Sequence, residues 1–123
     1  MCKRKIDSSY PVHVRKAKHI VDGDEEIFAD LLSTFLEHLP EQMQCIQEAV
    51  ENEDGDSVKF YTHQLKGGLR NFAADEASTT AYALEAAGAK REFQEARHVL
   101  SELRQEVEIL KKYIKNNAWK EFF

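Results

Sequence analysis

The chain has 123 residues, of which 42% are hydrophobic and 32% are charged, and its net charge is −5 at pH 7. That length supports one domain with a hydrophobic core, and the acidic balance argues against nucleic-acid binding, which needs a concentrated basic face. The sequence has no apolar run of about 18 residues and no apolar stretch behind the N-terminal charges, so we expect neither a membrane span nor a signal peptide. A cytoplasmic protein is the resulting prediction.

The first two predicted segments are a tail and a short helix. Residues 1–10 are expected to form a flexible N-terminal tail. Apolar residues then recur at helical spacing from Pro11 to about Asp22, which predicts a short helix that Gly23 ends. Proline suits the first turn of such a helix, because the N–H that it lacks would have no partner there.

A long helical pattern follows, with Asp24 as its N-cap. Apolar residues recur at the 3.6-residue period from Ile27 to Val50, and Pro40 interrupts them. Proline removes a backbone donor and clashes with the preceding turn of a helix. We therefore expect either one long helix that is kinked near residues 36–40 or two abutting helices.

The next predicted helix spans residues 56–72. It follows a turn at residues 52–55, and Asp56 and Ser57 are its candidate caps. Its apolar residues fall within one stripe at helical spacing, and they are Val58, Tyr61, Leu65, Leu69 and Phe72.

Two further helices complete the predicted fold. One begins at Asp75 and ends near Gly88. The last has apolar residues at the alternating spacing typical of a bundle seam, and they are Phe93, Ala96, Leu100, Leu103, Val107, Leu110 and Ile114. The predicted class is all-α, an up-and-down antiparallel four-helix bundle over residues 11–116 with a short extra N-terminal helix. Residues 117–123 are expected to be a C-terminal tail that docks on the bundle, contacts a partner or is partly disordered.

His63 lies on the face of its predicted helix opposite the apolar stripe, so its imidazole is expected to be exposed. Lys66 stands three residues further on, within side-chain reach of the same face. Gly67 and Gly68 follow, although a glycine in a helix interior costs about 1 kcal/mol relative to alanine. Two glycines in succession indicate clearance for another molecule that approaches His63 closely.

The residues around His63 resemble a known signature. Histidine-containing phosphotransfer (Hpt) domains carry leucine two positions after the histidine, lysine three after, glycine four after, asparagine eight after and a small residue eleven after. This chain has at those positions His63, Leu65, Lys66, Gly67, Asn71 and Ala74.

The resemblance extends over about residues 24–114 and includes the segment 35–40 and the pair at 84–85. Two departures are visible. Thr62 stands where the family often has alanine, and Ala73 stands where glycine is common. Both replacements are small or nearly so, and the resemblance holds with them.

The resemblance implies a phosphocarrier. His63 would accept the phosphoryl group through Nε2, and Lys66 would help to position the phosphoryl oxygens. Neutral imidazole, whose unperturbed pKa is about 6.5, is a good nucleophile near pH 7, and the phosphoramidate that it forms can hand the group on. Donor and acceptor would be aspartates of receiver domains in hybrid sensor kinases or response regulators. In such families Mg²⁺ belongs to the receiver, so we expect no bound metal or cofactor here and no independent catalytic activity.

A docking surface for the receiver is expected around His63. Phe60 is predicted to project beside His63, where an exposed aromatic ringed by polar groups is a suitable anchor; the alternative is that it tucks under a neighbouring helix. Lys59 and Arg70 lie near the same face and would add positive potential, and Gln64 adjoins the histidine.

Other functions fit the sequence less well. A metal site would need histidine pairs at helical spacing or an HExxH motif, and the sequence has neither. Asp75 and Glu76 are the carboxylates expected nearest to His63, on a separate helix. A non-phosphorylated helical adaptor that binds a kinase or receiver domain is the alternative function, but an adaptor needs neither His63 nor Lys66. The phosphoacceptor domain of a histidine kinase would need an adjoining catalytic domain. A monomer is expected, because one bundle can satisfy its own seam positions.

Overall fold

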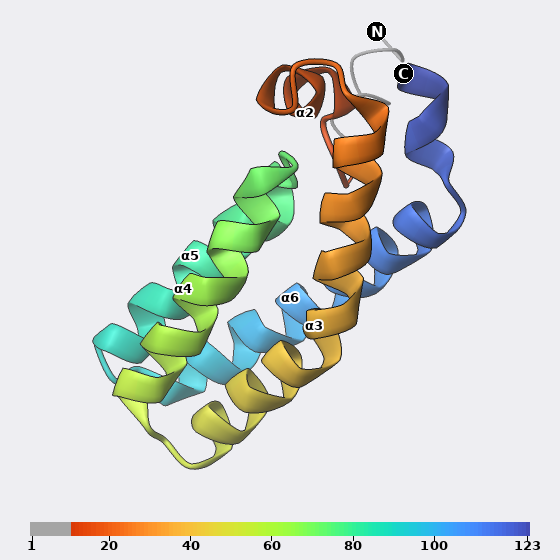
Figure 1. Ribbon diagram of the computed structural model, residues 1–123. Helices are drawn as coiled ribbons and strands as arrows, with labels where there is room; N and C mark the ends of the chain where they lie inside the picture. Colours follow the sequence, from red (N-terminus) through yellow and green to blue (C-terminus); the bar gives the residue numbers. More distant parts are fainter. Residues whose placement is uncertain (1–10) are drawn as a thin grey trace, which may run out of the picture.

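The computed structural model describes residues 11–123, and within them it contains five α-helices, one 3₁₀-helix and no strand (Figure 1). The elements in chain order are α2 (Val14–Ile20), α3 (Glu25–Glu51), α4 (Gly55–Asn71), α5 (Asp75–Ala89), α6 (Phe93–Lys115) and η1 (Ala118–Phe122). The predicted all-α class is confirmed. The tail predicted over residues 1–10 lies outside the described residues. None of the helices in the described range is both long enough and apolar enough to cross a membrane.

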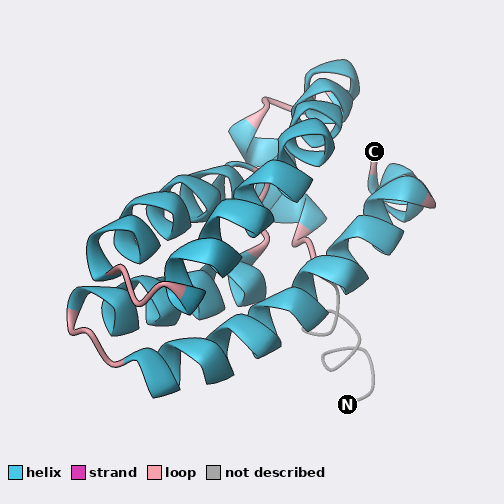
Figure 2. Cartoon of the chain, turned by 90° about the horizontal axis from the view of Figure 1, so that it is seen from below, coloured by secondary structure: helices cyan, strands magenta, loops and turns pink. Residues whose placement is uncertain are grey.

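The helices pack against their neighbours in the chain. α4 packs along α5, α5 packs along α6, and α3 contacts both α4 and α6, so these four helices share one buried apolar core. Their connections are residues 52–54, 72–74 and 90–92, and Figure 2 shows helices joined by short loops. Such short connections leave each helix room only to run back along the one before it.

Each of these connections turns through a residue with a left-handed backbone. The residues are Glu53 (φ 52°), Ala73 (φ 58°) and Arg91 (φ 58°). A side chain with a Cβ atom is strained in this region, whereas glycine is not. A glycine at the position of Ala73 would adopt this backbone conformation without strain.

α3 is one helix that runs through Pro40, which is the first of the two alternatives that the sequence left open. Figure 1 shows its ribbon changing direction part-way along its length, as expected for a proline inside a helix. Asp24 caps its start as predicted, because its side chain accepts a hydrogen bond from the Ile27 N–H at 3.1 Å.

Two predicted helix starts are shifted in the structure. α4 is capped by Asp54, not by Asp56 or Ser57, because Asp54 accepts hydrogen bonds from the Ser57 N–H (3.2 Å) and the Ser57 hydroxyl (2.8 Å). α2 begins three residues after Pro11, at Val14. The His13 N–H donates to the Ala73 carbonyl at 3.0 Å, which ties the chain before α2 to the α4–α5 connection.

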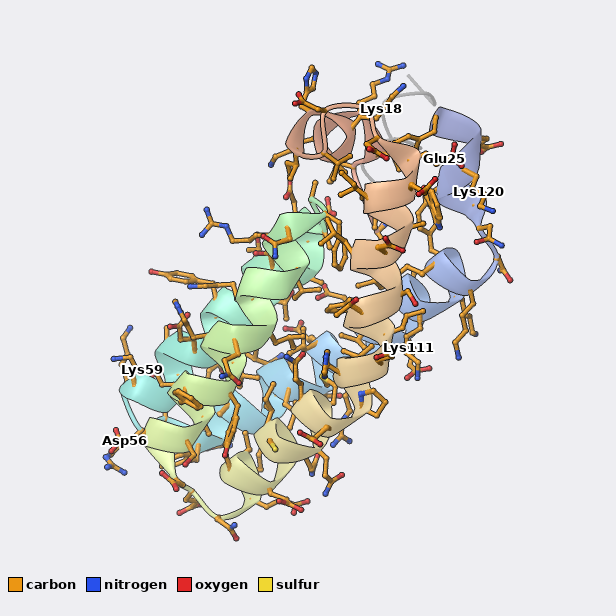
Figure 3. All side chains as sticks on the ribbon, viewed as in Figure 1. Lys18, Glu25, Asp56, Lys59, Lys111 and Lys120 are labelled. Atoms are coloured by element: carbon orange, nitrogen blue, oxygen red, sulfur yellow. The ribbon has the colours of Figure 1, made fainter. Side chains whose placement is uncertain are left out.

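The segment after α6 packs against the start of α3. Trp119 is 3% exposed, and its ring meets the Phe28 ring edge-on with centroids 5.3 Å apart. The Phe123 ring stacks on Phe28 from another side, at 5.2 Å. Figure 3 shows Lys18 and Lys120 at this end of the molecule. Of the three possibilities left open for residues 117–123, the structure shows docking.

Candidate functional site

His63 projects from the solvent face of α4. The opposite face of this helix is buried through Val58, Leu65 and Leu69, none of which has any exposed surface. The apolar stripe thus fixes the rotation of α4 about its axis, and this rotation leaves 67% of the His63 side chain exposed.

A carboxylate from α5 links His63 to Lys66. Glu85 Oε2 lies 3.0 Å from Nδ1 of His63, and Glu85 Oε1 accepts a hydrogen bond from Lys66 Nζ at 2.7 Å. The Glu85 and Lys66 side chains are each 14% exposed, so this pair is largely shielded from water. Leu84 is fully buried and holds α5 against the core, which places the adjacent Glu85 at the boundary with α4.

The charge of Glu85 determines which nitrogen of His63 is free. Burial raises the pKa of the Glu85 carboxyl, but the hydrogen bonds from Lys66 and His63 outweigh burial, so this pKa lies below the ordinary value of 4.5. An ionised carboxylate can only accept hydrogen bonds, so Nδ1 of His63 must donate. In the neutral ring the proton therefore resides on Nδ1, and Nε2 carries the lone pair that can attack an electrophile.

The Lys66 ammonium is held between a carboxylate and an aromatic ring. Besides its 2.7 Å hydrogen bond to Glu85, its Nζ lies 5.1 Å from the centroid of the Tyr82 ring. Tyr82 lies on α5 and is 62% exposed. The lysine therefore has a defined position beside His63 and does not extend freely into solvent.

The two glycines after Lys66 have different surroundings. A Cβ atom built on Gly67 would meet no heavy atom within 4 Å, so Gly67 borders open space. A Cβ atom on Gly68 would lie 3.4 Å from Cδ1 of Phe35, so Gly68 faces α3. Of the two glycines, Gly67 borders open space, whereas Gly68 packs against α3.

A shallow depression next to His63 is lined by both α4 and α5. Its walls come from Asp56, Lys59, Phe60, His63, Gln64 and Glu85. Phe60 is 57% exposed, and its ring forms a T-shaped pair with the adjacent Tyr61 ring at 5.3 Å, so it does not tuck under another helix. Figure 3 labels Lys59 and Asp56 at the outer edge of the molecule. Arg70 is exposed further along α4 and does not line this depression.

The carboxylate beside His63 is not one of those expected from the sequence. Asp75 instead accepts a hydrogen bond from Lys16 at 2.8 Å, and Glu76 lies 3.1 Å from Nε2 of His13. These contacts join α5 to the segment at α2, and they give His13 a partner that its sequence context did not indicate. Neither Glu85 nor Tyr82 was assigned to the site from the sequence, although the pair at 84–85 was part of the family resemblance.

A sequence model of the Hpt domain matches residues 30–113, which is more than half of the chain. The chain belongs to the Hpt domain family. Among solved structures, the crystal structure of histidine-containing phosphotransfer protein B (HptB) from Pseudomonas aeruginosa PAO1 is similar to this Hpt chain, with a TM-score of 0.81 and 21% sequence identity. The match covers 89% of this chain and 95% of HptB. At that identity the likeness shows the fold. A search of curated proteins found no significant match.

Membership of the Hpt family gives the chain a phosphotransfer role in a two-component phosphorelay. Hpt domains are phosphocarriers rather than catalysts, and they interact with receiver domains. Among the described residues, no group of three or more histidine, cysteine, aspartate or glutamate side chains is placed to hold a metal ion.

Proposed function

We propose that His63 accepts a phosphoryl group from a receiver-domain aspartate and passes it to an aspartate of a second receiver. The observation that carries this proposal is the state of the His63 ring. Its side chain is 67% exposed, and the hydrogen bond to Glu85 commits Nδ1 and leaves Nε2 as the nucleophile. An exposed ring with one nitrogen reserved for attack is what a carrier needs.

In the transfer step, His63 is the residue of this chain whose bonds change. The Nε2 lone pair attacks phosphorus, the N–P bond forms as the P–O bond to the receiver aspartate breaks, and the aspartate leaves as a carboxylate. The ring keeps its Nδ1 proton and becomes a phosphorylated imidazolium, whose positive charge Glu85 Oε2 stabilises at 3.0 Å. The imidazolium is also a good leaving group for the second receiver, so the same contact supports transfer in both directions.

Lys66 supplies positive charge where the phosphoryl oxygens arrive. Its Nζ is anchored 2.7 Å from Glu85, within one side chain of the His63 ring. A positioned cation stabilises charge that develops during transfer more effectively than one that must first be ordered. Lys66 would thus meet the incoming phosphoryl oxygens from this anchored position beside His63.

The receiver would dock around His63, on the exposed Phe60 and the polar side chains of Lys59, Gln64 and Arg70. Gly67 provides clearance, because open space surrounds the position of its missing Cβ atom. Mg²⁺ would be supplied by the receiver, and no metal or cofactor of this chain's own takes part.

The proposed scaffold is an up-and-down antiparallel four-helix bundle of α3–α6 with α2 as an extra N-terminal helix, in agreement with the contacts between these helices. We also infer a monomer without independent catalytic activity. The seam residues of α6 support this, because Leu103, Val107 and Leu110 are buried within the chain itself. A cytoplasmic location stays a prediction from the sequence.

The test is phosphoryl transfer from a phosphorylated receiver domain to three proteins: the wild type, His63→Gln and His98→Gln. His98 is the matched control, because its side chain is 70% exposed and also lies near a glutamate, Glu102, at 3.9 Å. Acid-labile, base-stable label is expected on the wild type and on His98→Gln, and none on His63→Gln. Label on all three proteins would refute the assignment of His63.

Binding of the receiver without label on the wild type would favour the adaptor function instead. Circular dichroism should show unchanged helicity for His63→Gln, because the side chain is largely outside the core. A loss of helicity would mean that His63 is needed for folding, contrary to its exposure.

Glu85 allows a second test of the same step. Glu85→Gln keeps an acceptor oxygen for Nδ1 but removes the charge that stabilises the imidazolium, whereas Glu85→Ala removes both. We expect slower transfer in Glu85→Gln and the slowest in Glu85→Ala, by roughly tenfold or more, since a hydrogen bond to a charged group is worth about 1.5–3 kcal/mol. Equal rates for all three proteins would exclude a role for Glu85.

A further inference from the structure

Tyr82 stands beside the site, yet neither the sequence pattern nor the transfer step uses it. It lies on α5 three residues before Glu85, and 62% of it is exposed. Its ring centroid is 5.1 Å from the Lys66 ammonium.

The geometry fits a cation–π interaction. An ammonium within about 6 Å of an aromatic centroid is attracted to the ring face, and at exposed positions this shifts an equilibrium by about two- to fivefold. Fixing the Lys66 ammonium at one place costs conformational entropy, because a lysine side chain has many rotamers and loses most of them. A favourable contact with the Tyr82 ring offsets part of this cost. Glu85 alone holds Nζ from one side, and the Tyr82 ring adds a second contact.

We propose that Tyr82 is a positioning residue for phosphoryl transfer, because its ring keeps the Lys66 ammonium next to His63. This inference rests on the proposed function of His63 and Lys66. The chain of contacts runs from Tyr82 to Lys66, from Lys66 to Glu85, and from Glu85 to Nδ1 of His63. Tyr82 therefore acts on the phosphoryl group through Lys66 and does not touch the reacting atoms.

A direct contact between Tyr82 and the docked receiver is the competing explanation, since the side chain is exposed. The two explanations differ in how Tyr82 and Lys66 combine. If Tyr82 acts through Lys66, its removal has no further effect once the ammonium is gone. If Tyr82 contacts the receiver, its removal slows transfer equally with or without Lys66.

The experiment measures the transfer rate from a phosphorylated receiver to Tyr82→Phe, Tyr82→Leu, Lys66→Met and the double variant Tyr82→Leu/Lys66→Met. We expect Tyr82→Phe to keep the wild-type rate, because it keeps the ring face. Tyr82→Leu should be about two- to fivefold slower, and the double variant should match Lys66→Met. Ile109→Ala is the control for losing an exposed apolar side chain, because Ile109 is 56% exposed on α6.

A rate for the double variant that is lower than that of Lys66→Met by the same factor would overturn the proposal. A wild-type rate in Tyr82→Leu, with a lowered rate in Lys66→Met, would also overturn it. A loss in Tyr82→Phe equal to that in Tyr82→Leu would do the same, because the hydroxyl and not the ring would then be responsible.

NMR separates this inference from the proposed function, since it needs no phosphoryl group. The Tyr82 ring current should shift the Lys66 side-chain protons nearest to Nζ, and the shift should persist in Tyr82→Phe and disappear in Tyr82→Leu. Unchanged Lys66 shifts in Tyr82→Leu would refute the contact, whatever the transfer assay shows. A wild-type chain that takes no label would refute the proposed function, and it would also refute a role of Tyr82 in transfer. The NMR result would still decide whether the Tyr82 ring contacts Lys66.

Discussion

Replacement of Gly67 separates the needs of folding from those of transfer. A Cβ atom at Gly67 would meet no heavy atom within 4 Å, so alanine introduces no clash there. In a helix interior alanine is favoured over glycine by about 1 kcal/mol. We therefore expect Gly67→Ala to raise the free energy of unfolding by about 1 kcal/mol, which is a rise in Tm of about 3–5 °C for a domain of this size.

Gly88 provides the matched contrast, because it is also a glycine inside a helix. A Cβ atom on Gly88 would lie 2.5 Å from Cγ1 of Val58, where α5 packs on α4. Overpacking of this kind costs about 1–3 kcal/mol and outweighs the gain in helix propensity. Urea unfolding followed by circular dichroism should thus give a higher free energy of unfolding for Gly67→Ala than for the wild type, and a lower one for Gly88→Ala.

Gly67→Leu then tests why a glycine is retained at this position. Leucine is a good helix former, and its Cβ atom would meet no heavy atom within 4 Å at Gly67, so the variant is expected to fold at least as stably as the wild type. Its side chain would occupy the space through which the receiver approaches His63, and transfer should fall strongly. A destabilised Gly67→Ala would refute the open space around Gly67, and normal transfer to a folded Gly67→Leu would refute its use as clearance.

Three further predictions concern stability, each measured by urea unfolding. Glu53→Gly should stabilise the chain by about 0.5–1 kcal/mol relative to Glu53→Gln, because residue 53 has a left-handed backbone (φ 52°) that glycine adopts without strain, and both variants lose the exposed ion pair with Arg97; no gain over Glu53→Gln would mean that the turn is not strained. Burial raises the pKa of the Glu106 carboxyl, so the folded chain binds this proton more tightly than the unfolded chain. That contribution to stability is present at low pH and is lost as the pH rises through the folded-state pKa. Glu106→Gln should therefore be more stable than the wild type at pH 7, with the difference vanishing below the ordinary glutamate value of 4.5; a difference independent of pH would contradict this. Trp119→Ala should lower the free energy of unfolding by about 3–5 kcal/mol through lost packing on Phe28. No change on this substitution would mean that the segment after α6 does not dock.

The helices that carry the site were largely predictable from the sequence, since helical periodicity depends on residues close together in the chain. The stripe of α4 predicted both the helix and the outward direction of His63, and Asp24 predicted the start of α3. Helix starts were less certain. Asp54 and Asp56 are both acceptable caps by residue type, and only the backbone conformation of the loop selected Asp54.

The partners of the site residues were not predictable in the same way. Glu85 lies 22 residues after His63, and it reaches Nδ1 only because α5 packs on α4 at one particular rotation and height. Asp75 and Glu76 lie nearer in the sequence but at the start of α5, beyond the C-terminal end of α4, where Lys16 and His13 pair with them.

The all-α class and an exposed histidine, followed by a lysine and a glycine on one helix face, could be predicted from the sequence, because they follow from residue spacing within a helix. Only the packing of the helices shows which nitrogen of His63 is free, where the Lys66 ammonium lies between Glu85 and the Tyr82 ring, and that Trp119 docks on Phe28. These depend on how separate helices are rotated and aligned against one another, which is settled by the packing of the whole core.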